Sequence, residues 1–401
     1  MNEWKTYQLG DLCNSISNTY RGKAQNVVLI NTSDVLEGKC LNHHKEPNEN
    51  IKGQFKKTFQ KGDILYSEIR PSNKRFAYID FDAIDYIAST KLMVLRANEK
   101  IRPLYLFYIL QSQSVIDELQ MLAESRSGTF PQITFSELSL LTTALPDIES
   151  QDKIINILKS LDDKIELNRR INANLEAQAQ ALFRLWFINS EAQNSNPGFF
   201  NDIIQTTLSG DWGQETPKGN YISEVYCIRG ADIPDIKCGD KGKLPTRYIL
   251  EKNLVNKKLS ENDLVVEISG GSPTQSTGRI CLITKALLNR LDKDVICTNF
   301  CRALKPIQDY SFFTYLYWQY LYSKDTMFSY ENGTTGIKNL NITDFINKEP
   351  IIIPEKKKIL EFNKVLQPIF DMIYKNGREN ERLSTLRDTL LPKLMAGEIN
   401  V

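Results

Sequence analysis

"LPDIESQDKIINILKSLDDKIELNRRINANLEAQAQALF" runs from Leu145 to Phe183, and a related segment, "IPEKKKILEFNKVLQPIFDMIYKNGRENERLSTLRDTLL", runs from Ile353 to Leu391. Shifted by 208 positions, the two segments align without a gap. The shift places Pro146 on Pro354, Leu158 on Leu366, Ile165 on Ile373, Arg170 on Arg378 and Leu182 on Leu390. A repeat of this length indicates that the chain builds the same structural unit twice.

Both segments have the periodicity of a long helix. In the first copy, seam residues recur at alternating spacings of four and three, and the series Ile154, Leu158, Leu161, Ile165, Asn168, Asn172, Leu175, Ala179, Leu182 and Trp186 follows this heptad rule. No glycine or proline interrupts the chain from Asp147 to Asn196. We therefore expect a long helix in each copy, with an apolar seam that packs against a partner helix.

Each seam carries two asparagines near its centre, Asn168 and Asn172 in the first copy and Asn376 and Asn380 in the second. Buried asparagine on such a seam costs stability and fixes the register of the helices. Antiparallel packing would bring all four amides together, whereas parallel packing would pair Asn168 with Asn376. The order of segments favours the antiparallel arrangement, and two unrelated surface helices with solvated asparagines are the alternative. If the amides meet, leucine at all four positions should stabilise the pair and loosen its register.

The repeat extends upstream of the helices. "KGDILYSEIRPSNKRFAYI" (Lys61 to Ile79) resembles "ENDLVVEISGGSPTQSTGRICLI" (Glu261 to Ile283), and both predict a strand, a polar loop and a strand. The sequence thus predicts an α+β fold with two α/β domains, separated by two long antiparallel coiled-coil helices in a pseudo-two-fold internal repeat. The expected boundaries are 1–145 for the first domain, 146–189 for the first spacer helix, 200–353 for the second domain and 354–395 for the second spacer helix.

Composition excludes several classes of protein. Hydrophobic content of 41% and charged content of 25% are ordinary for a soluble globular chain, and no apolar stretch predicts a membrane span or a signal peptide. The seven cysteines are scattered, which favours thiols and a cytoplasmic location. With a net charge of +1, any DNA-binding surface must gather its Lys and Arg on one face.

Catalytic and cofactor motifs are missing from the sequence. The only histidines, His43 and His44, are adjacent in a polar stretch and give little support to a catalytic triad. Cys297 and Cys301 have no histidine nearby, so buried thiols are favoured over a zinc site. No phosphate-binding Gly-x-x-x-x-Gly-Lys-Ser/Thr motif occurs. We expect no catalytic residue, no metal and no cofactor.

Two further enzymatic interpretations are weak. An adenine methyltransferase needs an Asp/Asn-Pro-Pro-Tyr/Phe loop for its flipped base, and the chain has no Pro-Pro pair. Asp147, Asp162 and Lys164 could form a nuclease core only by a forced choice, because charges beside a heptad seam are usually its solvated face.

Two variable halves, each followed by a similar long helix, resemble the specificity subunits of type I restriction-modification enzymes. The resemblance is carried by "LPDIESQDKI" and "IIPEKKKI" at the helix starts, by "ALFRLWF" and "LLPKLMAGEI" at their ends, and by "YQLGDLC", "SGTF" and "NGTTGIKNL" elsewhere. "IPEKKK" departs from the family's "PPLEEQ" signature by lacking its glutamine. The resemblance spans the whole chain.

The resemblance implies a mechanism in which each half reads one part of a split double-stranded DNA sequence. It implies that the helices set the gap and dock two methyltransferase subunits, which restriction subunits join. Loops between strands are where such readers place side chains, and Arg, Asn and Gln suit base edges. The predicted DNA-binding residues are Arg70, Asn73, Lys74, Arg75, Arg126 and Thr129 in the first half, and Thr274, Gln275, Ser276, Arg279, Thr334 and Lys338 in the second.

Two rival interpretations remain open from the sequence. The chain could be a coiled-coil scaffold that assembles partners without binding DNA, and the absence of DNA binding in the presence of methyltransferase subunits would indicate it. It could also be a self-contained methyltransferase or nuclease, which binding of S-adenosylmethionine by the chain alone would support.

Overall fold

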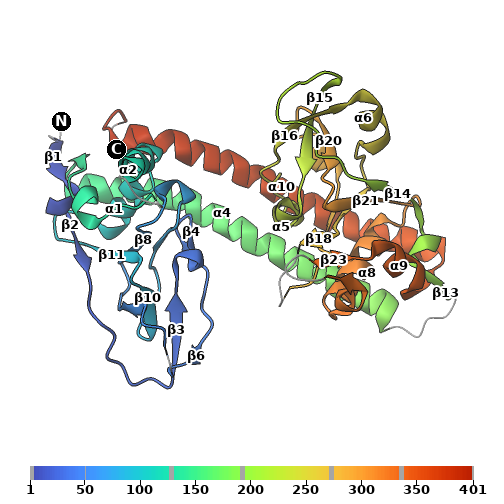
Figure 1. Cartoon of the computed structure of the whole chain (residues 1–401), viewed down its shortest axis with the longest axis horizontal. Coiled ribbons are helices and arrows are strands. Elements are labelled where there is room, and N and C mark those ends of the chain that lie inside the picture. The colour runs from blue at the N-terminus through green and yellow to red at the C-terminus, as the bar shows by residue number, and fades with distance from the viewer. Residues whose placement is uncertain are drawn as a thin grey trace. The chain divides into compact units, whose positions relative to one another are not determined.

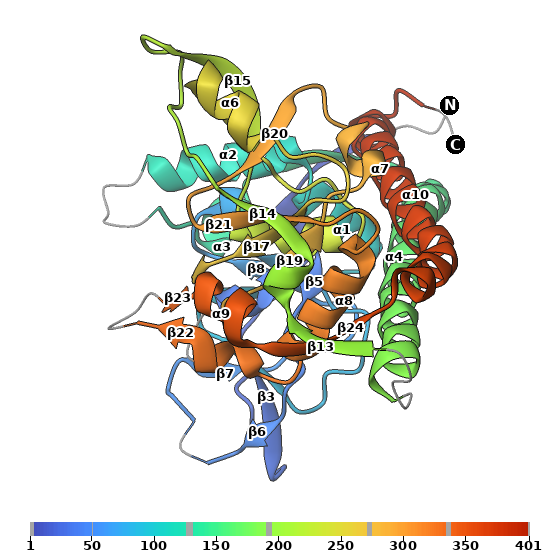
Figure 2. The same cartoon turned by 90° about the vertical axis from the view of Figure 1, so that its right-hand side faces the viewer.

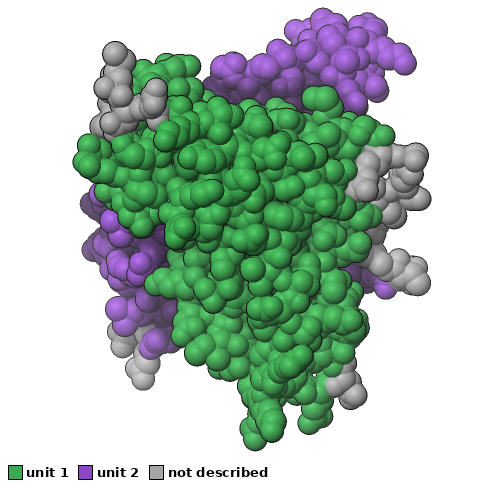
Figure 3. All heavy atoms as spheres, turned by 90° about the vertical axis from the view of Figure 1, so that its left-hand side faces the viewer, with its two compact units in different colours: residues 1–162, 385–401 green, residues 163–384 purple. Residues whose placement is uncertain are grey.

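The computed structural model describes residues 4–49, 51–125, 131–189, 195–270, 275–333 and 338–399. The chain forms two compact units, one made of residues 1–162 with 385–401 and the other of residues 163–384 (Figure 3). The limits of the units fall inside the two long helices, α4 (Ile148–Phe183) and α10 (Lys356–Met395). No helix among the described residues is long and apolar enough to cross a membrane.

The first unit contains two four-stranded sheets (Figure 1). One has the order β6-β3-β10-β7, with β6 (Glu46–Pro47), β3 (Asn26–Ile30), β10 (Tyr86–Ser89) and β7 (Phe55–Lys57). The other has the order β2-β11-β8-β9, with β2 (Cys13–Ile16), β11 (Leu92–Ala97), β8 (Ile64–Ser67) and β9 (Phe76–Tyr78). Two-stranded pairs are formed by β1 (Lys5–Gln8) with β12 (Thr142–Leu145) and by β4 (Val35–Leu36) with β5 (Lys39–Cys40).

Helices α1 (Pro103–Leu110), α2 (Gln113–Glu124) and α3 (Phe135–Leu138) complete the first unit. The sequence of α1, "PLYLFYIL", has no charged side chain, and its residues from Tyr105 to Leu110 are all buried, as expected for a helix that is apolar all round. They join one hydrophobic cluster with Leu158 of α4 and Leu394 of α10. Each long helix therefore contributes one end to the core of this unit.

The second unit repeats this plan (Figure 2). One sheet has the order β14-β21-β17-β19, with β14 (Ile204–Ser209), β21 (Cys301–Pro306), β17 (Leu264–Glu267) and β19 (Ile280–Leu282). A second sheet contains β16 (Thr246–Leu250), β15 (Tyr221–Ile228) and β20 (Asp294–Cys297), and a third contains β18 (Ser269–Gly270), β23 (Lys338–Leu340) and β22 (Glu331–Asn332). β13 (Ser195–Phe199) pairs with β24 (Pro350–Pro354) just before α10, as β1 pairs with β12 just before α4.

The second unit also contains the helices α5 (Ile233–Lys237), α6 (Glu251–Lys257), α7 (Lys285–Leu288), α8 (Ser311–Tyr322) and α9 (Ile342–Lys348). At the end of α4, a π-helical turn (Arg184–Ile188) directs Phe187 against Phe362 of α10, with ring centroids 4.7 Å apart. The predicted fold class, two α/β halves with two long antiparallel helices, is confirmed by this architecture.

A buried carboxylate recurs at the start of the matching strands β8 and β17. The Asp63 carboxylate accepts hydrogen bonds from the Gln60 amide at 2.8 Å and from the Arg96 guanidinium through two contacts of 2.7 Å. Asp263 does the same with the Ser260 amide and the Lys305 ammonium, both at 2.7 Å. Because a buried carboxylate needs compensation, these paired acids mark a repeated element of each sheet.

The Asp263–Lys305 pair generates a stability prediction. Burial raises the pKa of Asp263, while Lys305 lowers it. Lys305→Met should lower the unfolding free energy by roughly 3 kcal/mol at pH 8, because a buried carboxylate loses its cation. A raised folded-state pKa means that the folded state binds the proton more tightly, so this loss should shrink as the pH falls. Thermal unfolding of the wild type and of Lys305→Met at pH 8 and pH 5 measures this loss of stability.

The double variant Lys305→Met/Asp263→Asn is the control, because it removes the charge along with its partner. It should lose much of the pH dependence that the single variant shows. A single variant as stable as the wild type at pH 8 would contradict the assignment.

Candidate nucleic-acid interface and helical spacer

The loop between β8 and β9 holds the first group of predicted DNA-binding residues. Arg70 and Lys74 have positive φ angles of 44° and 52°, a conformation that costs about 1 kcal/mol or more for residues with a side chain. Such strain often marks functional sites. The loop is held by the Arg70 amide, which donates to the Pro131 carbonyl at 3.1 Å, and by the Ser72 amide, which donates to Gln120 Oε1 at 3.1 Å.

The four predicted side chains of this loop differ in availability. Arg70 and Asn73 are exposed, and Lys74 is half-buried. Arg75 is half-buried and its Nη1 donates to the carbonyl oxygens of Ser33 at 3.0 Å and Val35 at 3.4 Å. Arg75 is therefore occupied in bracing the neighbouring chain, while Arg70 and Asn73 present the more accessible polar groups.

Two other segments meet this loop. The Glu68 amide donates to the Lys91 carbonyl at 3.0 Å, and the Ile133 amide donates to the Glu68 carbonyl at 2.8 Å. The Lys91 ammonium also donates to Gln132 Oε1 at 3.3 Å. The turn at Lys91 thus belongs to the candidate surface, although the sequence analysis did not select it. Its only signal was a short polar break between the strands β10 and β11.

The second half reproduces this backbone frame. The Ile268 amide donates to the Phe300 carbonyl at 2.9 Å, and the Leu340 amide donates to the Ile268 carbonyl at 2.8 Å. Glu267 corresponds to Ser67 of the first half. The Glu267 amide donates to the Arg279 carbonyl at 2.9 Å, and the Ser67 amide donates to the Arg75 carbonyl at 2.9 Å. Three chain segments therefore converge in the same way in each half, with different side chains on them.

The predicted DNA-binding cations of the second half form ion pairs with carboxylates. The Arg279 guanidinium makes two contacts, of 2.7 and 2.6 Å, with the buried carboxylate of Glu267, which raises the pKa of Arg279. Lys338 lies 3.1 Å from the Glu331 carboxylate, and its ammonium sits 4.5 Å from the centre of the Phe328 ring. An arginine so held can pair bidentately with guanine only if it releases the carboxylate.

The remaining predicted residues fall into two groups. Gln275 is exposed, whereas Ser276 is 3% exposed and its carbonyl accepts a hydrogen bond from the Tyr322 hydroxyl at 3.1 Å. Ser276 thus lies inside the domain and not on its surface, because the chain turns inward between Gln275 and β19. Arg126, Thr129, Thr274 and Thr334 lie outside the described residues.

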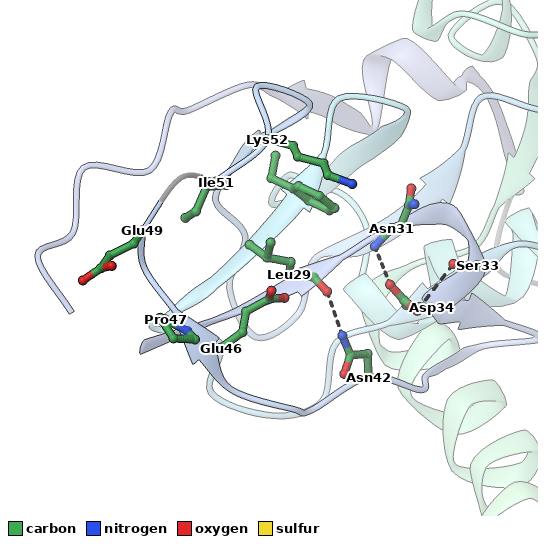
Figure 4. A pocket seen from close by; sticks show the side chains of 11 residues that line it. Leu29, Asn31, Ser33, Asp34, Asn42, Glu46, Pro47, Glu49, Ile51 and Lys52 are labelled. Carbon is green, nitrogen blue, oxygen red and sulfur yellow. Dashed lines mark hydrogen bonds between the residues drawn. The ribbon is translucent and has the colours of Figure 1, made fainter. Parts of the chain in front are cut away.

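A surface cavity of about 330 Å³ lies elsewhere in the first half (Figure 4). Among the described residues, its lining includes the carboxylates Asp34, Glu46 and Glu49 and one cation, Lys52. The Asp34 carboxylate already has a structural partner, because it accepts a hydrogen bond from the Asn31 amide at 2.7 Å. An excess of acidic groups repels phosphate, so this cavity is a poor place for a nucleic-acid backbone.

The residues considered for catalysis have structural partners. Asp162 accepts hydrogen bonds from the Tyr108 hydroxyl at 2.9 Å and from Arg387 Nη1 at 2.8 Å, while Asp147 accepts the Ser150 amide at the start of α4. Cys301 is buried, which raises its pKa to about 12, and such a thiol is inert at neutral pH. No cluster of three metal-binding side chains occurs among the described residues.

Helices α4 and α10 run side by side (Figures 1 and 2), and the four seam asparagines form hydrogen bonds between them. Asn168 Nδ2 donates to Asn380 Oδ1 at 3.0 Å, and Asn376 Nδ2 donates to Asn172 Oδ1 at 2.8 Å. Their exposed fractions are between 0% and 8%. The pairing of 168 with 380 and of 172 with 376 means that the helices are antiparallel here and that the amides are not solvated.

A close contact between two glycines ties the second globular half to α10. A Cβ built on Gly377 would lie 1.9 Å from the carbonyl oxygen of Gly239, so only glycine fits in the helix at this point. Asn172 Nδ2 donates to the Cys238 carbonyl at 2.9 Å and to the Ile373 carbonyl at 2.9 Å. One buried amide therefore links α4, α10 and the loop after α5.

The two asparagine pairs are not equivalent, which changes the expectation for leucine substitutions. Asn168 Oδ1 is buried and has no hydrogen-bond partner among the described residues, whereas Asn172 satisfies a carbonyl of the globular half. Asn168→Leu/Asn380→Leu should be close to neutral, because the two paired amides leave together and Glu379, which loses the hydrogen bond from Asn168 Nδ2 at 2.8 Å, keeps Lys164 as a partner at 3.5 Å. Asn172→Leu/Asn376→Leu should cost about 1–3 kcal/mol, because the Cys238 carbonyl loses its donor. Chemical denaturation of both variants tests the contrast.

Each variant is the matched control of the other, since both replace two buried asparagines by leucine in the same seam. Equal unfolding free energies for the two would argue against a special role for Asn172.

Comparisons with known proteins agree with this architecture. Residues 1–177 match a family model described as a type I restriction modification DNA specificity domain. The chain is 33% identical to the HindI type I restriction enzyme specificity subunit of Haemophilus influenzae, over 100% of both chains. It is 27% identical to the MjaIX specificity subunit of Methanocaldococcus jannaschii, over 74% of this chain and 69% of that one. The crystal structure of a type I restriction-modification S subunit from M. genitalium shares the fold, with a TM-score of 0.50, 16% identity, and coverage of 98% of this chain and 96% of that chain.

Proposed function

Because the chain belongs to the family of type I restriction-modification specificity subunits, we propose that each of its halves reads one part of a split DNA sequence. The chain is the specificity subunit of a type I restriction system and has no catalytic role of its own. The rival interpretation, a scaffold that does not bind DNA, is not favoured by this membership. Neither is a self-contained methyltransferase or nuclease.

One observation carries the proposal of two readers. In both halves the same backbone frame joins three segments, through Glu68 and Lys91 in the first half and Ile268 and Phe300 in the second. The side chains on the frame differ in charge and size between the halves. A common scaffold with different exposed side chains is what two independent readers of different half-sequences require.

We propose the division 1–145, 146–189, 200–353 and 354–395 as the functional domains of the chain. In the first reader, Arg70 and Asn73 are the best candidates for base edges, with Lys74 near the phosphates. In the second reader, Gln275 is the exposed candidate, and Arg279 and Lys338 can act only after exchanging their carboxylate partners for DNA. Arg126, Thr129, Thr274 and Thr334 stay proposals from the sequence alone.

The long helices offer a surface for the partner subunits. Leu167 is 49% exposed and Ile171 is 37% exposed one turn further along α4, and Val365 and Met372 of α10 are similarly exposed. Exposed apolar side chains gathered on a long helix are typical of a surface that another protein covers. We propose that two methyltransferase subunits dock there, that restriction subunits join this core, and that the complex works in the cytoplasm where it meets DNA.

The test is to co-express the chain with methyltransferase subunits and map the methylated sites of the genome. We expect a split sequence with a gap of about six base pairs, because readers on one face of DNA stand near one helical turn apart. A chain expressed without methyltransferase subunits is the control. A short continuous palindrome would contradict the model of two readers.

Exchange of residues 1–145 for the corresponding part of another specificity subunit tests the division of labour. Only one half of the mapped sequence should change, since each frame is built from residues of its own half. The reciprocal exchange of residues 200–353 should change the other half. If either exchange altered both half-sequences, the halves would not read independently.

A further inference from the structure

The turn between β20 and β21 presents an apolar side chain to solvent. Phe300 is 62% exposed, the largest exposed fraction of any phenylalanine among the described residues. Single exposed apolar residues are common on protein surfaces, so exposure alone carries little weight. The setting of Phe300 is what distinguishes it.

The backbone of this turn is held in place. The Phe300 carbonyl accepts hydrogen bonds from the amides of Ile268 at 2.9 Å and Ser269 at 3.2 Å, and the Cys301 amide donates to the Thr298 carbonyl at 2.9 Å. Ser269 begins β18, which pairs with β23 and so with Lys338. Phe300 therefore stands on a hydrogen-bonded turn beside β18, which belongs to the candidate DNA-reading surface of the second half.

The first half has a different side chain at the same backbone position. The Lys91 carbonyl accepts a hydrogen bond from the Glu68 amide at 3.0 Å, as the Phe300 carbonyl does from the Ile268 amide at 2.9 Å. Each residue is the last one of its turn, directly before β11 in the first half and β21 in the second. The Lys91 side chain is 51% exposed and lies 4.0 Å from the Glu68 carboxylate. The position thus keeps its backbone geometry while its exposed side chain changes from an ammonium to an aromatic ring.

The surroundings of Phe300 favour an apolar contact. Two predicted cations of this surface are paired with carboxylates, Arg279 with Glu267 and Lys338 with Glu331. Phe328, 36% exposed, packs under the Lys338 ammonium, so Lys338 has an apolar as well as an acidic partner. A phenyl ring donates and accepts no ordinary hydrogen bond, and in the major groove the apolar group that a base edge displays is the 5-methyl group of thymine.

We propose that Phe300 is a specificity-determining residue that contacts a thymine 5-methyl group in the half-sequence read by residues 200–353. This inference rests on the proposed function of the chain as a two-part DNA reader. It assigns to the second reader one position of its half-sequence, an A·T pair whose methyl group faces Phe300. Lys91 gives the first reader a cation at the equivalent place.

The experiment uses the chain assembled with its methyltransferase subunits and the split sequence mapped for that complex. Synthetic duplexes carry deoxyuridine in place of each thymine, one at a time, in the half-sequence that is retained when residues 1–145 are exchanged. Deoxyuridine lacks the 5-methyl group and keeps base pairing. One such replacement should weaken binding by the wild-type complex about fourfold, the effect of leaving one buried methyl group out.

Phe300→Ala should bind the unmodified duplex less tightly by a similar factor and should be insensitive to deoxyuridine at that one position. Val255→Ala is the matched control, because Val255 of α6 is 78% exposed and lies outside the candidate surface. It should keep both the wild-type affinity and the wild-type sensitivity. The unfolding midpoint of Phe300→Ala should equal that of the wild type, since most of the side chain is in solvent.

Three results would overturn the proposal: a retained half-sequence without any A·T pair, no effect of deoxyuridine at any position, or the same deoxyuridine sensitivity in Phe300→Ala as in the wild type. Failure of the proposed function would look different. The wild-type complex would then read no split sequence at all, and there would be no half-sequence in which to place deoxyuridine.

Discussion

The buried amides between α4 and α10 impose the constraint on which the second half of the structure depends. Asn168, Asn172, Asn376 and Asn380 leave water, and each buried amide that lacks a partner costs free energy. Only a narrow range of helix registers allows them to pair as observed. Asn172 extends this constraint to the globular half, because its amide also satisfies the carbonyl of Cys238.

The contact between Gly239 and Gly377 shows how tightly the globular half sits on its helix. Glycine inside a helix lowers stability by about 1 kcal/mol relative to alanine. Here its lack of a side chain lets the Gly239 carbonyl approach the α10 backbone, and Arg290 Nη1 binds the same carbonyl at 2.6 Å. A reader that is fixed to its spacer in this way holds its loops in a defined position relative to the helix, which is what a strict gap between half-sequences would require.

The two halves differ in how their predicted DNA-binding cations are paired. The chain has a net charge of +1, and in the second half the predicted cations Arg279 and Lys338 are paired with carboxylates. The first half keeps the exposed guanidinium of Arg70 on a strained loop. The two proposed readers therefore differ in chemistry, the first cationic and the second largely neutral and partly aromatic, while their backbone frames agree. Such a difference allows one fold to read two unrelated half-sequences.

The sequence alone determined the features that depend on local periodicity and on the internal repeat: the fold class, both long helices, the central asparagines and the matching loops around Arg75 and Arg279. Only the tertiary structure decided which side chains are free. The turns at Lys91 and Phe300 join the candidate surface through hydrogen bonds to Glu68 and Ile268, which lie more than twenty residues away in the sequence. The Glu267 carboxylate binds the Arg279 guanidinium because the folded sheet brings them together, and Ser276 is buried. Gly377 allows a close backbone contact, although its low helix propensity alone indicated a weak point in the helix. Local pattern cannot report these facts, since burial and pairing arise from chain segments that meet only after folding.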